Sequence, residues 1–172
     1  MLLVLAGCGT QDDLFPSSSD RTPPVQPGSS GSAVSQRAPD FTVSDSLGNI
    51  VTLSSVIPPR KGAVLYFTMW CPTCDAHMSY IRDNLISQPS YSNVVFFAVD
   101  YVSGSVAEAR NAELTNGYGG SGFIVLADTS QTILNLYHAT MATTIVIDKN
   151  RIVQMNEQFK AAKLQDTLAA LP

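Results

Sequence analysis

The feature that most constrains the fold of this chain is a pair of cysteines, Cys71 and Cys74, placed where an apolar segment meets a helical one. Residues 63–69 are nearly all apolar, which is typical of a strand buried on both faces of a sheet. Residues 74–86 carry apolar side chains three and four positions apart, which predicts a helix. A strand that leads directly into a helix would place the first cysteine at the helix N-terminus and the second one turn inside it.

This placement predicts a reactive thiol rather than a structural one. Unpaired amides and the helix dipole favour an anion at a helix N-terminus, so we expect a lowered pKa at Cys71 as nucleophile and a resolving role for Cys74. Pro72 suits the first helical turn, where its missing amide hydrogen costs nothing. A disulfide across so short a loop would stabilise the fold little. A zinc site would need further ligands, for which the sequence offers only His77 and His138.

The remaining patterns predict an α/β fold. Strands are expected at residues 41–43, 50–53, 63–69, 94–99, 123–127, 144–147 and 152–155, and helices at residues 74–86, 105–116, 131–137 and 161–171. Turn clusters at residues 45–49 and 148–151 join two pairs of strands into β-hairpins. The expected architecture is a central mixed sheet flanked by helices, with an antiparallel edge from the final hairpin and an added N-terminal hairpin.

The first residues suggest attachment to a membrane through a lipid. Residues 1–8 end in Leu-Ala-Gly-Cys and resemble the end of a bacterial lipoprotein signal, in which the cysteine, here Cys8, is lipidated. The alternative is a short apolar N-terminus that happens to end in Gly-Cys, because no Lys or Arg precedes the apolar run. Residues 9–37 are rich in Ser, Pro and Gly and predict a flexible tether, so the domain is expected to span residues 38–172. The protein would then lie in the cell envelope, facing the periplasm or the exterior, and Gly9 would favour the outer membrane in a host with two membranes.

Composition argues against several other functions. The chain has a formal net charge of -4 and a pI near 4.9, so it lacks the excess of positive charge that is typical of nucleic-acid-binding proteins. The glycines of residues 117–122 do not match a phosphate-binding spacing, which argues against a nucleotide site there. No stretch approaches the ~20 apolar residues of a membrane span.

Four motifs give the chain a family resemblance. They are Ala-Pro-Asp-Phe at residues 38–41, residues 48–53, Trp70-Cys71-Pro72-Thr73-Cys74, and Thr-Thr-Ile-Val-Ile-Asp at residues 143–148. On these motifs the chain resembles the TlpA/ResA-like branch of the thioredoxin superfamily, which is related to the peroxiredoxin-type AhpC/TSA redoxins. The resemblance implies a thioredoxin-like fold and dithiol–disulfide exchange with exported proteins, often in cytochrome maturation, with a membrane electron donor and no cofactor. A peroxiredoxin would instead carry a Thr-containing loop around its reactive cysteine.

Two positions depart from the family pattern. The residue before Thr143 is normally a cis-proline that faces the cysteines and docks substrate, but here it is Ala142, preceded by Met141. Because a cis bond without proline costs ~3 kcal/mol, we expect a trans bond, a rearranged loop and altered docking. Reducing members often have a glutamate three residues after the second cysteine, where this chain has His77. Its imidazole could act as base for the resolving thiol, and a half-exposed polar role is the alternative.

A metal-binding alternative stays open. Met69, Met78 and Met141 fall near the cysteines or in the loop expected to face them, and thiolate, thioether and imidazole groups are ligands for Cu(I). A copper-delivery protein resembling the SCO-type chaperones would use Cys71, Cys74, His77 and His138. Against it, SCO-type proteins separate their cysteines by three residues, and Met69 and Met78 occupy positions typical of core packing. A thioredoxin-like module that only binds a partner is the third interpretation, because Ala142 replaces the proline.

Overall fold

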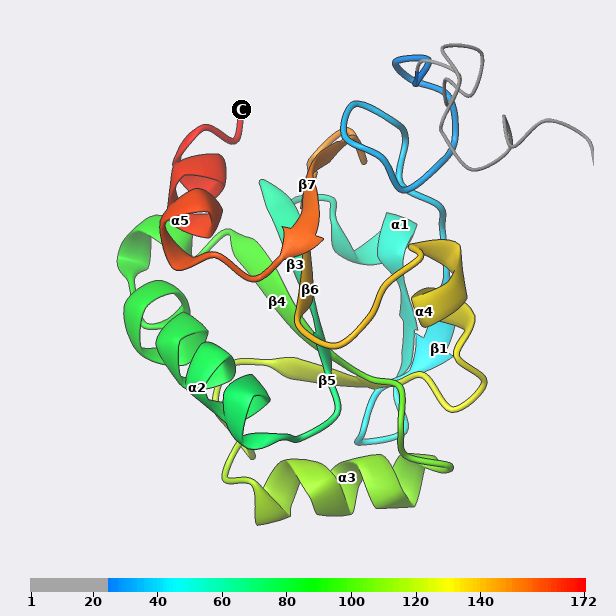
Figure 1. The fold of residues 1–172 in the computed structure, drawn as a ribbon, viewed down its shortest axis with the longest axis vertical. Helices are drawn as coiled ribbons and strands as arrows, with labels where there is room; N and C mark the ends of the chain where they lie inside the picture. The colour runs from blue at the N-terminus through cyan, green and yellow to red at the C-terminus, as the bar shows by residue number, and fades with distance from the viewer. Residues whose placement is uncertain (1–24) are drawn as a thin grey trace, which may run out of the picture.

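The computed structural model describes residues 25–172, which form a five-stranded mixed sheet between helices and a separate two-stranded hairpin (Figure 1). The strands of the main sheet are β3 (Gly62–Thr68), β4 (Val94–Asp100), β5 (Ile124–Ala127), β6 (Thr143–Asp148) and β7 (Val153–Gln158), in the spatial order β5-β4-β3-β6-β7. β4 is parallel to β3 and β5, whereas β6 is antiparallel to β3 and β7. The predicted mixed sheet with an antiparallel edge is confirmed.

Helices cover both faces of this sheet. They are α1 (Leu53–Val56), α2 (Pro72–Ile81), α3 (Val106–Thr115), α4 (Thr132–Leu136) and α5 (Ala161–Ala169), with a π-helical turn η2 (Arg82–Ile86) that continues α2 and a 3-10 turn η3 (Pro89–Tyr91). Figure 1 shows α2 and α5 on one side of the sheet and α1 and α4 on the other. α3 packs beside β5 at the lower end of that view.

Alternation along the strands divides the core into two layers. In β3, Leu65 and Phe67 face the layer that contains α1 and α4, whereas Val64 and Tyr66 face the layer that contains α2 and α5. Every residue of β3 and of β4 is buried. These two central strands therefore give rigid support to the loops at their carboxyl ends, where the cysteines lie.

The predicted N-terminal hairpin is formed by β1 (Thr42–Ser44) and β2 (Ile50–Thr52), which pair antiparallel. Its turn is held by the carboxylate of Asp45, which accepts hydrogen bonds from two amides within the turn. Leu53 was expected at the end of the second strand but opens α1 instead. It is fully buried against the sheet, so burial rather than strand pairing explains its apolar character.

Part of the predicted tether is attached to the sheet. The amide of Ser35 donates a hydrogen bond to the carbonyl of Val153, and the amide of Val153 donates to the carbonyl of Gln36, both at 2.9 Å. These bonds attach residues that precede Ala38, the residue at which the sequence predicted the domain to begin, to the sheet. Cys8, the predicted lipidation site, lies outside the described residues. Within the described part of the chain, no helix is long and apolar enough to cross a membrane.

Candidate active site

Cys71 and Cys74 lie at the start of α2, shortly after the carboxyl end of β3. Cys71 is the N-cap of the helix, and its Sγ accepts a hydrogen bond from the amide of Cys74 at 3.1 Å. Pro72 occupies the first helical turn, as the sequence predicted. Both cysteines are free, and Cys71 is partly exposed while Cys74 is fully buried. One sulfur atom is therefore presented to solvent, with the other held behind it.

The pKa values of the two thiols are shifted in opposite directions. A hydrogen bond with Cys74 raises the pKa of Cys71. At Cys74, burial acts to raise the pKa, but the hydrogen bonds with Cys71, the Met69 backbone and the Thr68 hydroxyl outweigh it, so the pKa of Cys74 is lowered. The lowered pKa expected at Cys71 is thus not found, because the buried sulfur collects more hydrogen bonds than the helix N-terminus offers to the exposed one. Exposure, rather than the order of the two pKa values, selects Cys71 as the sulfur that can meet a substrate.

Trp70, the residue before this thiol, is locked to the neighbouring strand. Its backbone is left-handed, with a φ of 59°, and its indole Nε1 donates to Asp100 Oδ2 at 2.8 Å. Asp100 ends β4, is fully buried, and also accepts hydrogen bonds from two following amides and from the hydroxyl of Ser103. The Trp70–Asp100 bond fixes the loop that carries Cys71. The sequence patterns did not single out Asp100, although an acidic residue directly after an apolar strand was an available signal.

The loop before β6 faces Cys71, as the family resemblance implies. Met141 Sδ lies 3.5 Å from Cys71 Sγ, and Met141 is 37% exposed. Ala142 is buried with a φ of 64°, and its amide donates to the carbonyl of Phe67 at 2.9 Å. The Met141–Ala142 bond is trans, so the expected rearrangement of this loop is observed. Thr143 is buried, and its hydroxyl accepts a hydrogen bond from an amide of the same loop.

His77 is linked to the cysteine pair through a buried tyrosine. Its Nδ1 is hydrogen-bonded to the hydroxyl of Tyr66 at 3.0 Å, and its ring stacks on Phe159 with centroids 4.2 Å apart. Burial lowers the pKa of His77, which favours the neutral imidazole. Burial, the charges of both cysteines and a hydrogen bond with Cys74 raise the pKa of Tyr66, so its hydroxyl stays protonated. Tyr66 thus stands between the resolving thiol and a neutral base. The sequence had shown it only as one residue of a buried strand.

The two histidines of the predicted copper set do not join the cysteines in a metal site. His138 is exposed at the end of α4, and His77 is engaged by Tyr66. Among residues 25–172, no three His, Cys, Asp or Glu side chains are grouped so that they could hold a metal ion.

Two of the three methionines near the motif lie at the surface. Met78 is fully buried in the core, as its helical spacing predicted. Met69 was also expected in the core but is 44% exposed, because β3 ends at Thr68 and the chain turns away from the sheet. Met69 and Met141 are both exposed, and Met141 contacts the reactive sulfur.

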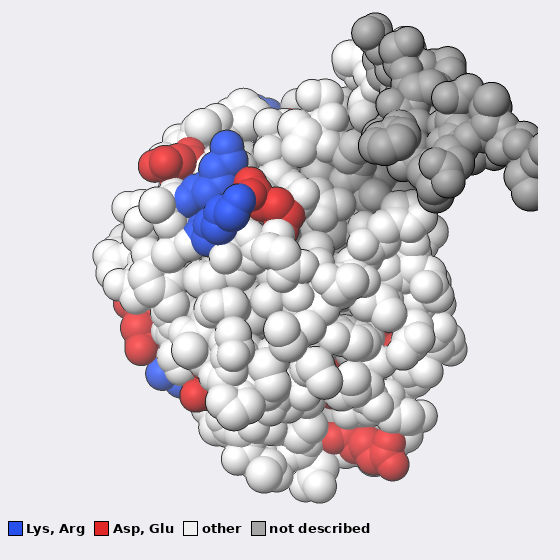
Figure 2. All heavy atoms as spheres, in the orientation of Figure 1, with Lys and Arg blue, Asp and Glu red and all other residues white. Residues whose placement is uncertain are grey.

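Three of the loops at this end of the sheet carry no charged residue. Residues 68–74, 101–107 and 137–143 contain no Asp, Glu, Lys or Arg. Figure 2 shows that charged side chains gather in clusters toward the periphery of the visible face and leave its centre uncharged. Val102, which follows the end of β4, is 49% exposed and adds to the apolar surface. These three loops are therefore uncharged, and the carboxylates near the reactive thiol are those of Asp75, in the first turn of α2, and of Asp100, which accepts from Trp70.

The AhpC/TSA family model matches residues 34–156, a span that includes both cysteines. The chain belongs to the AhpC/TSA family. This places it among the thioredoxin-like redoxins, whose chemistry is in general thiol-based redox chemistry. A search of curated proteins found no match.

Several solved structures share the fold of this redoxin. DsbF of Mycobacterium tuberculosis is 21% identical with a TM-score of 0.62, over 77% of this chain and 95% of that one. A secreted disulfide oxidoreductase of the same organism, homologous to E. coli DsbE, is 20% identical with a TM-score of 0.58, over 76% and 96%. The peroxidoxin BcpB of M. tuberculosis is 20% identical with a TM-score of 0.63, over 80% and 95%. The predicted thioredoxin-like fold is confirmed.

Proposed function

We propose that this redoxin exchanges dithiols for disulfides with other exported proteins, with Cys71 as nucleophile and Cys74 as resolving thiol. The observation that carries the proposal is the partly exposed Cys71 at the N-cap of α2 with the buried Cys74 directly behind it. The DsbF and DsbE-like structures support it by sharing the fold. Attachment through Cys8 to a membrane of the cell envelope, with a membrane electron donor as a second partner, completes the proposal.

In the reducing direction, the Cys71 thiolate attacks a substrate disulfide, forms a mixed disulfide and releases one substrate thiolate. Cys74 then attacks Cys71 Sγ, which releases the second substrate thiolate and leaves an internal disulfide. The substrate gains two electrons and the redoxin loses two. Cys74 loses its proton before it attacks, and the released substrate thiolate takes that proton up. The Tyr66 hydroxyl, which is also hydrogen-bonded to Nδ1 of the neutral His77, donates to the Cys74 sulfur and so stabilises its thiolate.

The surroundings of Cys71 also suggest the kind of substrate. Met69 and Met141 are flexible, polarisable side chains that adapt to varied apolar partners. Because no charged residue lies in the loops around the thiol, an uncharged polypeptide segment next to the disulfide is favoured. Backbone pairing at Ala142 is not offered, since its amide already donates to Phe67.

The test compares single-cysteine variants of the full chain in a Cys8→Ser background, which removes the third thiol. With a disulfide-linked peptide as substrate, Cys71→Ser should abolish exchange, and Cys74→Ser should accumulate a mixed disulfide at Cys71 detectable by mass spectrometry. Disulfide exchange that persists in Cys71→Ser, or a mixed disulfide found on Cys74, would contradict the proposal. Adding hydrogen peroxide in place of the peptide tests peroxide reduction, and faster turnover of peroxide would contradict disulfide exchange.

A second candidate, Cu(I) binding, is favoured by one contact. Cys71 Sγ and Met141 Sδ lie 3.5 Å apart, so Cys71, Cys74 and Met141 offer three soft sulfur donors without either histidine. An anaerobic Cu(I) titration of the reduced chain, with Met141→Leu as the matched variant, separates the two functions. Stoichiometric copper binding that Met141→Leu weakens, together with no exchange, would replace the first proposal by the second. If the chain shows neither exchange nor copper binding, the third interpretation, a module that only binds a partner, is the one that remains.

A further inference from the structure

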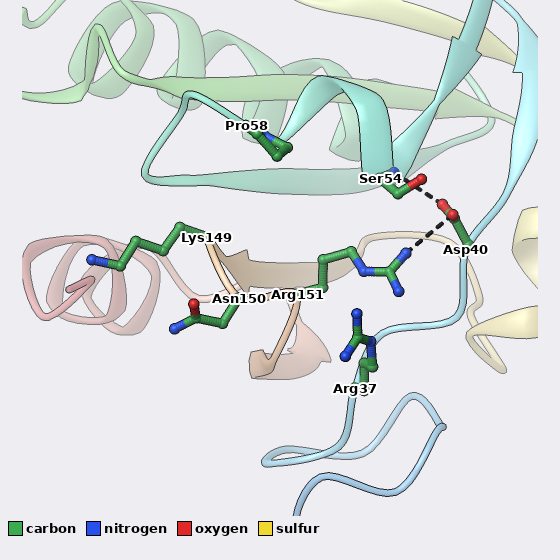
Figure 3. Close-up of a pocket in the computed structure, with 7 residues that line it drawn as sticks. All are labelled: Arg37, Asp40, Ser54, Pro58, Lys149, Asn150 and Arg151. Carbon is green, nitrogen blue, oxygen red and sulfur yellow. Dashed lines mark hydrogen bonds and ion pairs between the residues drawn. The ribbon is translucent and has the colours of Figure 1, made fainter.

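A second site lies at the opposite end of the sheet from the cysteines. The turn between β6 and β7 follows Asp148, which pairs with Gly62 at the start of β3, whereas Cys71 follows the end of β3. At this turn the surface opens into a cavity of about 660 Å³ (Figure 3). Its charged lining residues are Arg37, Asp40, Lys149 and Arg151. No step of thiol exchange uses this cavity.

The cavity is positively charged in a protein that is negatively charged overall. Three of its lining side chains are cations and one is a carboxylate, although the chain carries a net charge of -4. The carboxylate belongs to Asp40, whose Oδ2 accepts from Arg151 at 3.0 Å and whose Oδ1 accepts from the amides of Phe41 and Ser54. Among the described residues, no carboxylate forms an ion pair with Arg37. Figure 3 shows the Arg37 side chain extending toward the guanidinium of Arg151.

Arg151 is held in this position at a cost in backbone strain. Its φ is 64°, a left-handed conformation that favours glycine and that other residues adopt only with strain. The turn is fixed by Asp148, whose Oδ1 accepts hydrogen bonds from the amides of Asn150 and Ile152. The Arg151 side chain is only 19% exposed. Glycine would satisfy this turn without strain, so the guanidinium group is what arginine adds there.

We propose that this cavity binds a phosphate group, held by the guanidinium groups of Arg37 and Arg151. Guanidinium groups offer forked donors that match the oxygens of carboxylates and phosphates. Phosphate has the larger number of acceptor oxygens, and Arg151 already meets a carboxylate in Asp40, which favours phosphate as the added ligand. Figure 3 shows Lys149 extending away from both arginines, so it contributes only long-range attraction. The molecule that carries this phosphate group is a soluble phosphate ester or an anionic phospholipid, and the same two arginines would bind either one.

Isothermal titration calorimetry of the full chain with inorganic phosphate and with glycerol 3-phosphate tests this site. Arg37→Gln should weaken binding at least tenfold. Arg151→Gly should do the same, because it removes the guanidinium while glycine suits the left-handed turn. Lys163→Gln removes an exposed charge from α5, outside the cavity, and should stay within twofold of the unmodified chain.

Cosedimentation with vesicles distinguishes the two kinds of phosphate-carrying molecule. A lipid head group is assigned if the protein cosediments with phosphatidylglycerol vesicles but not with phosphatidylcholine vesicles, and if both arginine variants lose this binding. Saturable binding of glycerol 3-phosphate without vesicle retention assigns a soluble ester. The proposal is overturned if no probe binds saturably, if the arginine variants bind as the unmodified chain does, or if acetate binds as tightly as phosphate. None of these outcomes depends on the cysteines.

Discussion

Replacing Ala142 by proline probes how the loop opposite Cys71 is built. Ala142 has a φ of 64°, whereas proline is fixed at about −65°, so the loop cannot keep its present conformation. Proline also removes the amide that donates to Phe67 at 2.9 Å, and leaving that buried carbonyl without its donor costs about 1–3 kcal/mol. With the backbone conflict added, we expect the free energy of unfolding to fall by at least about 3 kcal/mol.

Calorimetry should show this loss as a fall of roughly 10 °C in the unfolding temperature of a chain of this size. Ala142→Gly is the matched control, because it keeps the amide and suits a positive φ, and it should be neutral or up to about 1 kcal/mol more stable. Exchange rates are measured on the same samples. If Ala142→Pro unfolds at the same temperature as the unmodified chain and exchanges faster, the loop accepts the cis-proline arrangement of the family and the reasoning is refuted.

Three further substitutions test other parts of the structure. Trp70→Phe removes the indole donor from the buried Asp100 and should cost about 1.5–3 kcal/mol in chemical denaturation; an unchanged midpoint would contradict the proposed locking of the loop. Burial lowers the pKa of His77 below 6.5, so its contribution to stability is complete above pH 6.5 and is lost as the pH falls through the folded pKa. His77→Asn should therefore flatten the fall in stability between about pH 7 and pH 5, and an unaltered slope would argue against it. Glu113→Ala removes the buried carboxylate that accepts from Ser46 and should destabilise by about 1–3 kcal/mol in urea titration; an unchanged midpoint would contradict a role for this bond in holding the hairpin to α3.

The elements of the main sheet were predictable because each has a strong local pattern. Residues 63–69 and 94–99 are continuous apolar runs, and both form strands buried on two faces. α1 was missed because it has four residues, too few to show a helical period, and its buried Leu53 continues an apolar run that reads as a strand. The attachment of Ser35 and Gln36 to Val153 uses backbone groups, which leave no pattern in side-chain polarity.

The candidate site was predictable where one motif contains it and unpredictable where the fold assembles it. Cys71, Cys74 and Met141 meet as the family resemblance implied. Tyr66 and Asp100 come from separate strands, and their roles depend on tertiary contacts that spacing does not reveal. The order of the thiol pKa values was likewise beyond the sequence, because it depends on hydrogen bonds that converge on a buried sulfur.

The hydrogen bonds of Ser35 and Gln36 to Val153 also bear on the solubility of the domain. β7 is the outermost strand at its end of the sheet, and an uncovered outer strand is a template on which a second chain can pair. Residues 35–37 cover its first residues, where an isolated bridge also joins Arg37 to Ile152. A fragment cut at residue 38 would bare that strand and invite edge-to-edge aggregation, whereas a fragment that begins at residue 25 retains its own protective cover.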